Sequence, residues 1–421
     1  MGSYDCQNGV TPDLRYIPLS YSHADSQATA LRLILTLFPH WEGPGNKVEF
    51  VRFTDGITNT LLKIINRKPG LTEEEIDNDA VLMRAYGMGT EVLIDRERTE
   101  SPGLTQLLAE KPPSTLFSRA AVLLPPLLAR FKNGLPIPLY SRETLRPLGP
   151  GNASGLRGVA RKLGHWHAVL PNEGTGSSEW QATLGKQDEG ISLIQPRRAG
   201  QSMWAVLQKW ILALPVNTAE QRDRRLALQK ELHWVLDQLD DGKGIGEDGL
   251  VFAHGDLLCA NVIVLPSDES ASTEDGIAPV TFIDYEYAVP APAAFDIANH
   301  LAEWIGYDCD YNMIPTQSVR RQFMAEYAKS YCQHRGLDSS AEAEIVARLY
   351  DDVDRFRGIP GLYWGVWALI QAQISQIDFD YASYAELRLG EYWAWKREVD
   401  GSREAAGEEK SLREQRWSQL A

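Results

Sequence analysis

The sequence predicts an α+β protein with two lobes, a small antiparallel sheet followed by a larger, mainly helical part. Short β-rich runs occupy residues 48–87, and helical spacing of apolar residues begins at Leu156 and continues through the C-terminal half. The 421 residues, 43% of them hydrophobic, suffice for one large or two coupled domains. We expect a nucleotide-binding lobe over residues 1–148, with an inserted proline-rich segment at about 101–148, and a catalytic and acceptor-binding lobe over residues 149–421.

Composition and charge exclude several classes of protein. The chain has 42 Lys and Arg against 57 Asp and Glu, a formal net charge of −15, so its charge gives no reason to expect nucleic acid or an anionic membrane surface as a partner. Four cysteines without a CxxC pair disfavour a zinc ribbon or a disulfide scaffold. The first thirty residues lack the apolar run of a secretory signal, so we do not expect one, and the most apolar run, residues 120–129, is too short for a membrane span. We expect a cytoplasmic protein, and the sequence leaves open whether it is a monomer or a homodimer.

The predicted first lobe opens with a hairpin. Residues 48–66, VEFVRFTDGITNTLLKIIN, place β-rich runs on both sides of a Thr-Asp-Gly turn. Residues 80–87, AVLMRAYG, are typical of a buried strand, and a helix can follow from Asp95. Eight prolines between Lys111 and Pro150 oppose a long helix and an unbroken central strand. We therefore expect a linker and an inserted loop in that segment.

Helical spacing identifies the second lobe. Apolar residues recur every three or four positions in its first helix, at Leu156, Val159, Leu163, Trp166 and Leu170. Two strand-like runs, LVFAHGD and PVTFIDYEY, flank the run NVIVL. The same apolar spacing predicts helices around residues 297–304, 323–331 and 364–374. The charged tail, residues 401–421, is expected to be a frayed or solvated helix.

The segment VFAHGDLLCANVIVL carries the clearest signal for chemistry. An apolar strand leads into His254 and Asp256, and Asn261 follows five residues after Asp256. Protein kinases use this spacing in their catalytic loop, where the Asp accepts the proton of the attacking hydroxyl and the Asn holds a magnesium ion. Asp284 ends the apolar run VTFI, where a second metal-binding aspartate would lie. Carboxylate and amide oxygens are the ligands that Mg²⁺ requires, so we expect these side chains to meet around one ion.

Each of these residues also has an ordinary structural explanation. Asp and Asn are common in turns because their side chains bond nearby backbone, so an Asp and an Asn five residues apart would usually belong to a loop. The order and spacing of the four residues His254, Asp256, Asn261 and Asp284 favour the kinase interpretation. No GxxxxGK[ST], HExxH or GxSxG pattern occurs. The GxGxxG match at Gly244, Gly246 and Gly249 precedes a strand and does not open a helix, so we expect a loop there.

These segments resemble a known family. HGDLLCANVIV followed by FIDYEYAVPAPAAFDIANHLAEW resembles the paired signature of choline and ethanolamine kinases, which share a eukaryotic protein-kinase-like fold. The resemblance extends to FTDGITNTLLKI, VLMRAYG and YWGVWALIQAQISQIDFDYASYAELR, and so covers residues 48–396. Choline kinases usually read HNDCQEGN and IDFEY, whereas HGDLLCAN and IDYEY are similar to the ethanolamine branch. The resemblance implies ATP-dependent phosphorylation of ethanolamine to phosphoethanolamine, the first step toward phosphatidylethanolamine by the CDP-ethanolamine route.

The resemblance also implies roles for individual residues. Asp256 would be the catalytic base and would contact the acceptor, and Asn261 and Asp284 would be the Mg²⁺ ligands of a reaction that uses ATP. An acceptor with an ammonium group needs carboxylates or aromatic faces around it. The resemblance places such residues at Glu286, Tyr287, Asp296, Glu303, Trp364, Trp367 and Tyr384. Asp296 could instead cap a helix or brace the catalytic loop, and the two tryptophans could be ordinary core residues.

The nucleotide site is expected in the first lobe. Arg84 takes the place of the lysine with which protein kinases contact phosphate, and its guanidinium can bond two phosphate oxygens. Its partner could be Glu97 or Glu100. The turn that would cover the phosphates consists of Asp55, Gly56, Thr58 and Asn59. The hinge strand of the family is replaced here by LPIP, where Pro136 and Pro138 remove two ladder donors.

Three alternatives follow. The acceptor could be choline, because both alcohols carry an ammonium group. The altered hinge could leave a pseudokinase that binds a partner without turnover. An antibiotic-type phosphotransferase shares the fold and the HGD loop, but the tryptophan-rich C-terminal segment argues against it.

Overall fold

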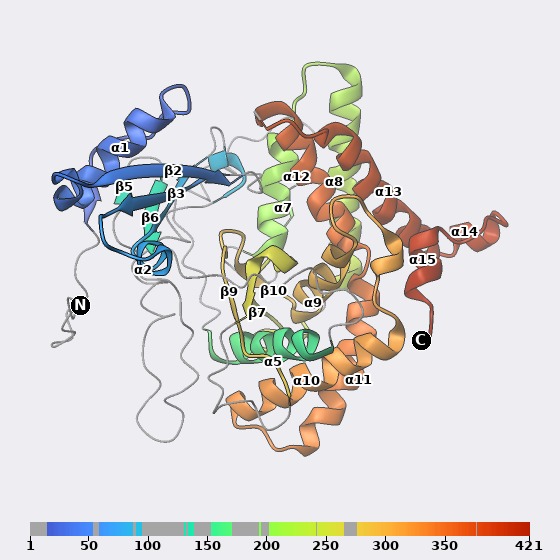
Figure 1. Ribbon diagram of the computed structural model, residues 1–421. Helices are drawn as coiled ribbons and strands as arrows, with labels where there is room; N and C mark the ends of the chain where they lie inside the picture. Colours follow the sequence, from blue (N-terminus) through green and yellow to red (C-terminus); the bar gives the residue numbers. More distant parts are fainter. Residues whose placement is uncertain are drawn as a thin grey trace. The chain divides into compact units, whose positions relative to one another are not determined.

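The computed structural model describes residues 15–53, 59–86, 90–94, 130–131, 134–138, 153–170, 193–194, 202–240, 242–264, 276–375 and 377–421. The chain divides into two compact units, the first from residues 1–90 and 101–141, the second from residues 91–100 and 142–421 (Figure 1). The expected boundary at residue 148 lies outside the described residues and stays a prediction. Among the described residues, no helix combines the length and the apolarity needed to cross a membrane.

The first unit is built on one six-stranded sheet. Its elements are β1 (Tyr16–Ile17), α1 (Ser26–Leu37), η1 (Pro39–Glu42), β2 (Lys47–Phe53), β3 (Asn59–Arg67), α2 (Glu73–Asn78), β4 (Val81–Tyr86), β5 (Arg130–Phe131) and β6 (Gly134–Pro138). The strand order is β1-β5-β6-β4-β3-β2, and every pairing is antiparallel except that of β1 with β5. The predicted hairpin is β2 and β3, and the predicted buried strand is β4.

Strand β6 differs from the prediction for the proline-rich segment. Residues 134–138 pair with all but the last residue of β4, in the register Val81↔Pro138 to Ala85↔Gly134. The short strand β5 pairs with β6 only at Gly134, so Pro136 and Pro138 lie beyond the stretch that β5 covers. A proline is tolerated where no strand pairs on the side that its missing N–H group would face, and among the described residues β5 does not pair with β6 at Pro136 or Pro138. The prolines therefore did not prevent a strand here.

Helix α1 covers one face of this sheet. Ala30, Leu33 and Ile34 form its buried side. They belong to a core cluster with residues of β1, β3 and β4 and with Trp41 of η1, as expected for an amphipathic helix packed on a sheet.

The second unit is mainly helical. Its elements are α5 (Ala153–Val169), α7 (Met203–Ala213), α8 (Ala219–Leu239), β7 (Val251–Ala253), η3 (Cys259–Asn261), β8 (Val262–Val264), β9 (Val280–Phe282), β10 (Val289–Ala291), α9 (Ala293–Ala302), η4 (Glu303–Ile305), η5 (Tyr311–Met313), α10 (Gln317–Arg335), α11 (Ser340–Phe356), α12 (Ile359–Ile374), α13 (Tyr381–Val399), α14 (Ser402–Ala405) and α15 (Leu412–Trp417). A further short turn, η2 (Thr90–Val92), lies where the two units divide. Strands β7 and β10 pair antiparallel, as do β8 and β9. The predicted helices are present as α5, α9, α10 and α12.

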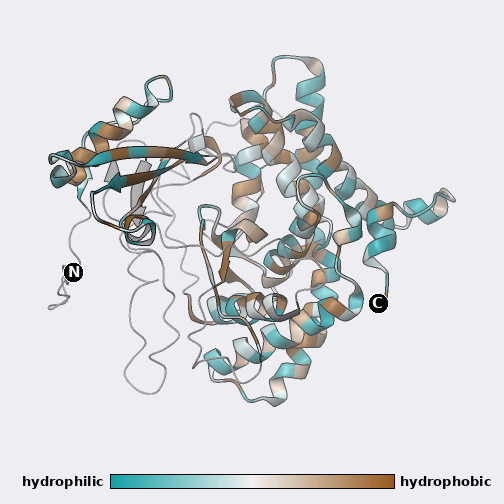
Figure 2. Ribbon diagram, viewed as in Figure 1, coloured by the Kyte–Doolittle hydropathy of each residue, from teal (hydrophilic) through white to brown (hydrophobic). Residues whose placement is uncertain are grey.

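Close helix packing fixes the position of α5. At Gly164, an added Cβ atom would lie 2.4 Å from the carbonyl oxygen of Tyr327, so α5 and α10 approach each other more closely than a side chain allows. Trp166 of α5 is fully buried and donates a hydrogen bond from Nε1 to the Phe252 carbonyl of β7 (2.9 Å). Helices of this unit carry both hydrophilic and hydrophobic residues, as expected when one face packs and the other is solvated (Figure 2).

The C-terminal tail is packed, contrary to the prediction of a frayed or solvated helix. Trp417 of α15 is buried, and its Nε1 donates to Asp354 Oδ1 (2.7 Å). The backbone N–H groups of Gln317 and Ser318, at the start of α10, donate to the carbonyls of Gln419 and Leu420. The tail therefore supplies acceptors for N–H groups that a helix N-terminus leaves without intrahelical partners.

Candidate active site

The loop that follows β7 is held by its own histidine. The Nε2 atom of His254 lies 3.1 Å from the Ile283 carbonyl, and its Nδ1 atom lies 3.3 Å from the backbone N–H of Asp256. Burial lowers the pKa of His254 to about 4, so the ring is neutral near pH 7. A neutral ring that donates through Nε2 and accepts through Nδ1 satisfies both contacts.

Asp296 of α9 braces the same loop. Its two carboxylate oxygens accept the backbone N–H groups of His254 (2.8 Å) and Gly255 (2.9 Å). Its Oδ2 also lies 2.9 Å from Nε2 of His167, whose Nδ1 lies 2.6 Å from the Tyr327 hydroxyl. Burial alone would raise the pKa of Asp296, but the interactions with His167, His254 and the Gly255 N–H together outweigh it and lower that pKa. Of the two structural roles that the sequence left open, the structure shows the brace, because Pro292 is the N-cap of α9.

Gly255 lets two loops touch. Its φ is +77°, and an added Cβ atom would lie 2.5 Å from the carbonyl oxygen of Tyr287. Its own carbonyl accepts the side-chain amide of Asn299 (3.0 Å). Only glycine fits this backbone conformation and this approach.

Asn261 links the loop that carries Asp256 to the loop that carries Asp284. Its Nδ2 donates to the Asp256 carbonyl (2.7 Å) and approaches Asp256 Oδ2 (3.3 Å). The Asn261 carbonyl accepts the backbone N–H of Ile283 (2.9 Å), directly before Asp284. Asp284 has a φ of 62°, a conformation that aspartate tolerates better than most residues and that often occurs at functional sites.

Three carboxyl groups gather around the Asp256 side chain. The loss of water around this carboxyl is the largest cause of a pKa well above its usual range. The charges of Asp284, Glu303 and Glu286, in that order, raise it further, and the Asn261 hydrogen bond opposes them. Such mutual repulsion makes the site attractive for cations. The predicted triad of residues 256, 261 and 284 therefore lies in one region.

The donor chemistry of this region suits a hard divalent cation. Asn261 uses its amide N–H₂ toward Asp256, which leaves the other arm of the amide, its oxygen, pointing away from that contact. In the described residues, no group of three or more His, Cys, Asp or Glu side chains is arranged to hold a metal. A magnesium site of one amide and one or two carboxylates needs no such group, because Mg²⁺ takes its other ligands from water and substrate phosphates.

The aromatic residues predicted for the acceptor form one row of ring contacts. Trp367 donates from Nε1 to the Tyr287 hydroxyl (2.9 Å), and Trp364 donates to Asn299 Oδ1 (2.7 Å). Neighbouring rings in the row, with centroids 4.8 to 6.0 Å apart, are Tyr287, Trp364, Trp367, Tyr381, Phe379 and Tyr307. Trp364 and Trp367 are thus both buried and part of this row.

Glu303 and Tyr384 lie beside a fully buried arginine. Nη2 of Arg388 is 3.4 Å from Glu303 Oε1. Burial raises the pKa of Glu303, and the Arg388 charge opposes this. The Tyr384 ring contacts the Tyr307 ring at 6.3 Å, and the charges of Asp256 and Glu303 add to the burial that raises the pKa of the Tyr307 hydroxyl. Arg388, Tyr307 and Tyr381 were not predicted from the sequence. Arg388 and Tyr307 each lie four positions after a predicted site residue, one helical turn away, and this spacing could have indicated them.

The residues predicted to bind nucleotide lie in the first unit or outside the described residues. Arg84 is half-buried in β4, opposite Leu61 and Leu135. Asn59 begins β3. The other members of the turn, Asp55, Gly56 and Thr58, lie outside the described residues, as do Glu97 and Glu100.

Two buried histidines predict a loss of stability in mild acid. Burial lowers the pKa of His254 and of His300 to about 4, from 6.5. The unfolded chain therefore binds more protons than the native state between pH 6.5 and about 4, so stability falls as pH falls through this window, by about 1.4 kcal/mol per pH unit for each ring. Urea unfolding from about pH 7 to about pH 5 measures this slope. His300→Gln should make the slope shallower, the exposed His40→Gln should not, and equal slopes in all three proteins would contradict the prediction.

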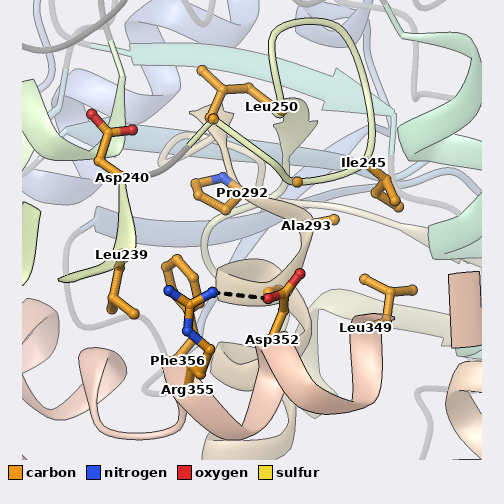
Figure 3. Close-up of a pocket in the computed structure, with 14 residues that line it drawn as sticks. Leu239, Asp240, Ile245, Leu250, Pro292, Ala293, Leu349, Asp352, Arg355 and Phe356 are labelled. Carbon is orange, nitrogen blue, oxygen red and sulfur yellow. Dashed lines mark hydrogen bonds and ion pairs between the residues drawn. The ribbon is translucent and has the colours of Figure 1, made fainter. Parts of the chain in front are cut away.

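A small pocket lies elsewhere in the second unit (Figure 3). It is lined by the end of α8, the glycine-containing loop at residues 242–250, the start of α9 and α11. The loop at Gly244, Gly246 and Gly249 is thus confirmed. Arg355 and Asp352 form an ion pair at 3.1 Å in its wall. None of the predicted catalytic or acceptor residues lines this pocket.

Solved structures show the class of fold. An ethanolamine kinase of Plasmodium vivax matches with a TM-score of 0.60 and 21% identity, covering 88% of both chains. A choline kinase of Cryptosporidium parvum matches with a TM-score of 0.58 and 18% identity, covering 89% of this chain and 97% of the other. The small antiparallel sheet and the mostly helical remainder are those of the protein-kinase-like fold.

The family follows from the sequence comparison. The family model described as choline/ethanolamine kinase matches residues 50–393, and the protein belongs to this family. Mouse ethanolamine kinase 1 is 31% identical over 380 residues, which are 88% of this chain and 89% of the mouse protein. Rat ethanolamine kinase 2 is 33% identical over 406 residues, 95% of this chain and 90% of the rat protein. The predicted family and fold class are confirmed.

Proposed function

We propose that the protein transfers the γ-phosphoryl group of ATP to the hydroxyl oxygen of ethanolamine, giving phosphoethanolamine and ADP. Family membership supports the kinase reaction, and the relatives named ethanolamine kinase, at 31% to 33% identity, support this acceptor. A place at the start of phosphatidylethanolamine synthesis, a cytoplasmic location and a homodimer remain predictions.

The observation that carries this function is the group of carboxylates beside the aromatic row. Asp256, Asp284, Glu286 and Glu303 lie close enough for the last three to raise the pKa of the first. A site that concentrates negative charge needs cations, and the substrates of this reaction supply them as an ammonium group and as the metal that accompanies ATP. Ethanolammonium has three N–H donors, which Glu303 and Glu286 can accept, whereas choline has none and would depend on ring faces.

The chain's own residues provide the chemistry. As the bond between the acceptor oxygen and the γ-phosphorus forms and the bond to the β-phosphate oxygen breaks, Asp256 takes the hydroxyl proton. Asp296 holds the backbone of the loop through His254 and Gly255, so the base keeps its place. Positioning of this kind supplies much of the rate in phosphoryl transfer.

The cofactors are ATP and a divalent metal, in keeping with the family. Asn261 and Asp284 would hold Mg²⁺, which when bound neutralises charge on the phosphates. Arg84 and the turn at residues 55–59 would contact the nucleotide.

The deciding experiment measures kcat/KM for ethanolamine and for choline with the purified chain and MgATP, with the product identified by phosphorus NMR. We expect phosphoethanolamine and at least a tenfold preference for ethanolamine, since a site built from hydrogen-bond acceptors discriminates against an alcohol without donors. A preference for choline would make the protein a choline kinase. No turnover of either alcohol, with no thermal stabilisation by MgATP, would support the pseudokinase alternative.

A further inference from the structure

A row of alternating buried charges leads away from the acceptor residues. Glu303 contacts Arg388 of α13, which is fully buried. The Nε atom of Arg388 lies 3.6 Å from Oε2 of Glu391, one turn further along the same helix. Arg388 is therefore shared between two carboxylates, one at the acceptor site and one behind it.

Glu391 in turn is shared between two arginines. Its Oε2 lies 3.7 Å from Nε of Arg413 on α15, and both side chains are at most 3% exposed. Arg413 also contacts Glu414 (Nη1 to Oε1, 3.2 Å) and donates to the Arg357 carbonyl. A buried carboxylate with one cation removed is strongly destabilised, so both arginines contribute to holding the Glu391 side chain.

Helix α15 has anchors that do not involve Arg413. Trp417 donates to Asp354, and the guanidinium of Arg320 lies 4.0 Å from the centre of its ring. Arg320 also donates to the Trp417 carbonyl (3.0 Å). Glu414 pairs with Arg357 at 2.8 Å. The helix can therefore stay docked when the charge of Arg413 is removed.

The loss of that charge should be felt at Glu303. Without Arg413, the ion-pair partner that remains to Glu391 in the described part of the chain is Arg388. Nη2 of Arg388 lies 3.4 Å from Oε1 of Glu303, which is already longer than an ideal charged hydrogen bond. Stronger attraction toward Glu391 draws the guanidinium away from Glu303 and frees the acceptor carboxylate to move.

We propose that Arg413 is a positioning residue of the acceptor site, because by neutralising Glu391 it leaves Arg388 to hold Glu303 in place for the ammonium group of the acceptor. This inference rests on the proposed function and assigns part of the acceptor site to the C-terminal helix, more than a hundred residues from Glu303 in the sequence.

The first test compares substrates. Arg413→Met should raise KM for ethanolamine roughly tenfold while kcat and KM for MgATP stay within about twofold of wild type. Arg413→Lys keeps the charge and should stay near wild type. The matched control is Arg416→Met on the same helix, since the Arg416 guanidinium donates to the Asn312 carbonyl and to the Gln419 side chain. An unchanged KM for ethanolamine in Arg413→Met, or an equal rise for both substrates, would overturn the proposal.

The second test separates charge balance from packing. In the double variant Glu391→Gln with Arg413→Met, no uncompensated carboxylate is left to attract Arg388, so KM for ethanolamine should return toward wild type. If the effects of the two substitutions on KM for ethanolamine simply add in the double variant, Arg413 acts by packing and the proposal is wrong. Calorimetric binding of ethanolamine and of choline, each with MgADP present, repeats the comparison without turnover. If wild type binds only choline, the proposed acceptor fails, while the choline affinities of the same variants still decide the role of Arg413.

Discussion

Asp256→Asn should lower kcat for ethanolamine phosphorylation by about a thousandfold, because an amide cannot take the proton of the attacking hydroxyl. KM for MgATP should change little. The same variant should be at least as stable to heat as wild type, since it removes a buried carboxyl group that is repelled by the charges of Asp284, Glu303 and Glu286. The combination of lost turnover and kept stability distinguishes a catalytic group from a structural one.

The measurement pairs steady-state kinetics with a thermal unfolding curve. Asp351→Asn, at an exposed position of α11, is the matched control and should change neither quantity. Wild-type turnover in Asp256→Asn would remove the assignment of the base, and with it the proposed mechanism.

The second large effect is expected at Asp296. Its carboxylate accepts two backbone N–H groups and contacts His167 while fully buried. In Asp296→Asn the amide N–H₂ must face at least one of these partners, which leaves a buried donor unpaired. We expect the free energy of unfolding to fall by about 3 kcal/mol. We also expect kcat to fall by about a hundredfold, because the loop that carries the base shifts.

Asp380→Asn provides the comparison for this variant. Asp380 also accepts a backbone N–H, that of Ser383 at 3.0 Å, but as an exposed N-cap where asparagine serves equally well. Urea unfolding and kcat should both stay near wild type in Asp380→Asn. Similar behaviour of the two variants would show that Asp296 is not the brace of the catalytic loop.

Local patterns predicted most of the fold. The hairpin of β2 and β3 was visible because both strands are β-rich on either side of a turn, and α5, α10 and α12 because their apolar spacing is regular. Strand β6 was not predicted because tolerance of Pro136 and Pro138 depends on how far β5 extends beside them. The packed tail was missed for a related reason, since the charges of α15 are compensated by residues far away in the sequence.

The site shows the same limit. His254, Asp256, Asn261 and Asp284 were recognisable because short loops and strand ends fix their spacing. Asp296 was predicted only as one of several possibilities, since it reaches the loop only after α9 folds back on β7. Arg388 was not predicted, since it reaches Glu303 across 85 positions. Ion pairs between buried residues that are far apart in the chain produce no periodic pattern in the sequence.

The contact at Gly255 sets a limit on redesign of this protein. The glycine has no room for even one methyl group against the Tyr287 carbonyl. A mutation that widens the space around the Tyr287 ring to admit bulkier alcohols would therefore also disturb the backbone beside the proton acceptor. Variants that accept a wider range of alcohols are expected to have a lower kcat. Restoring kcat should require compensating changes in the segment from residue 253 to residue 258.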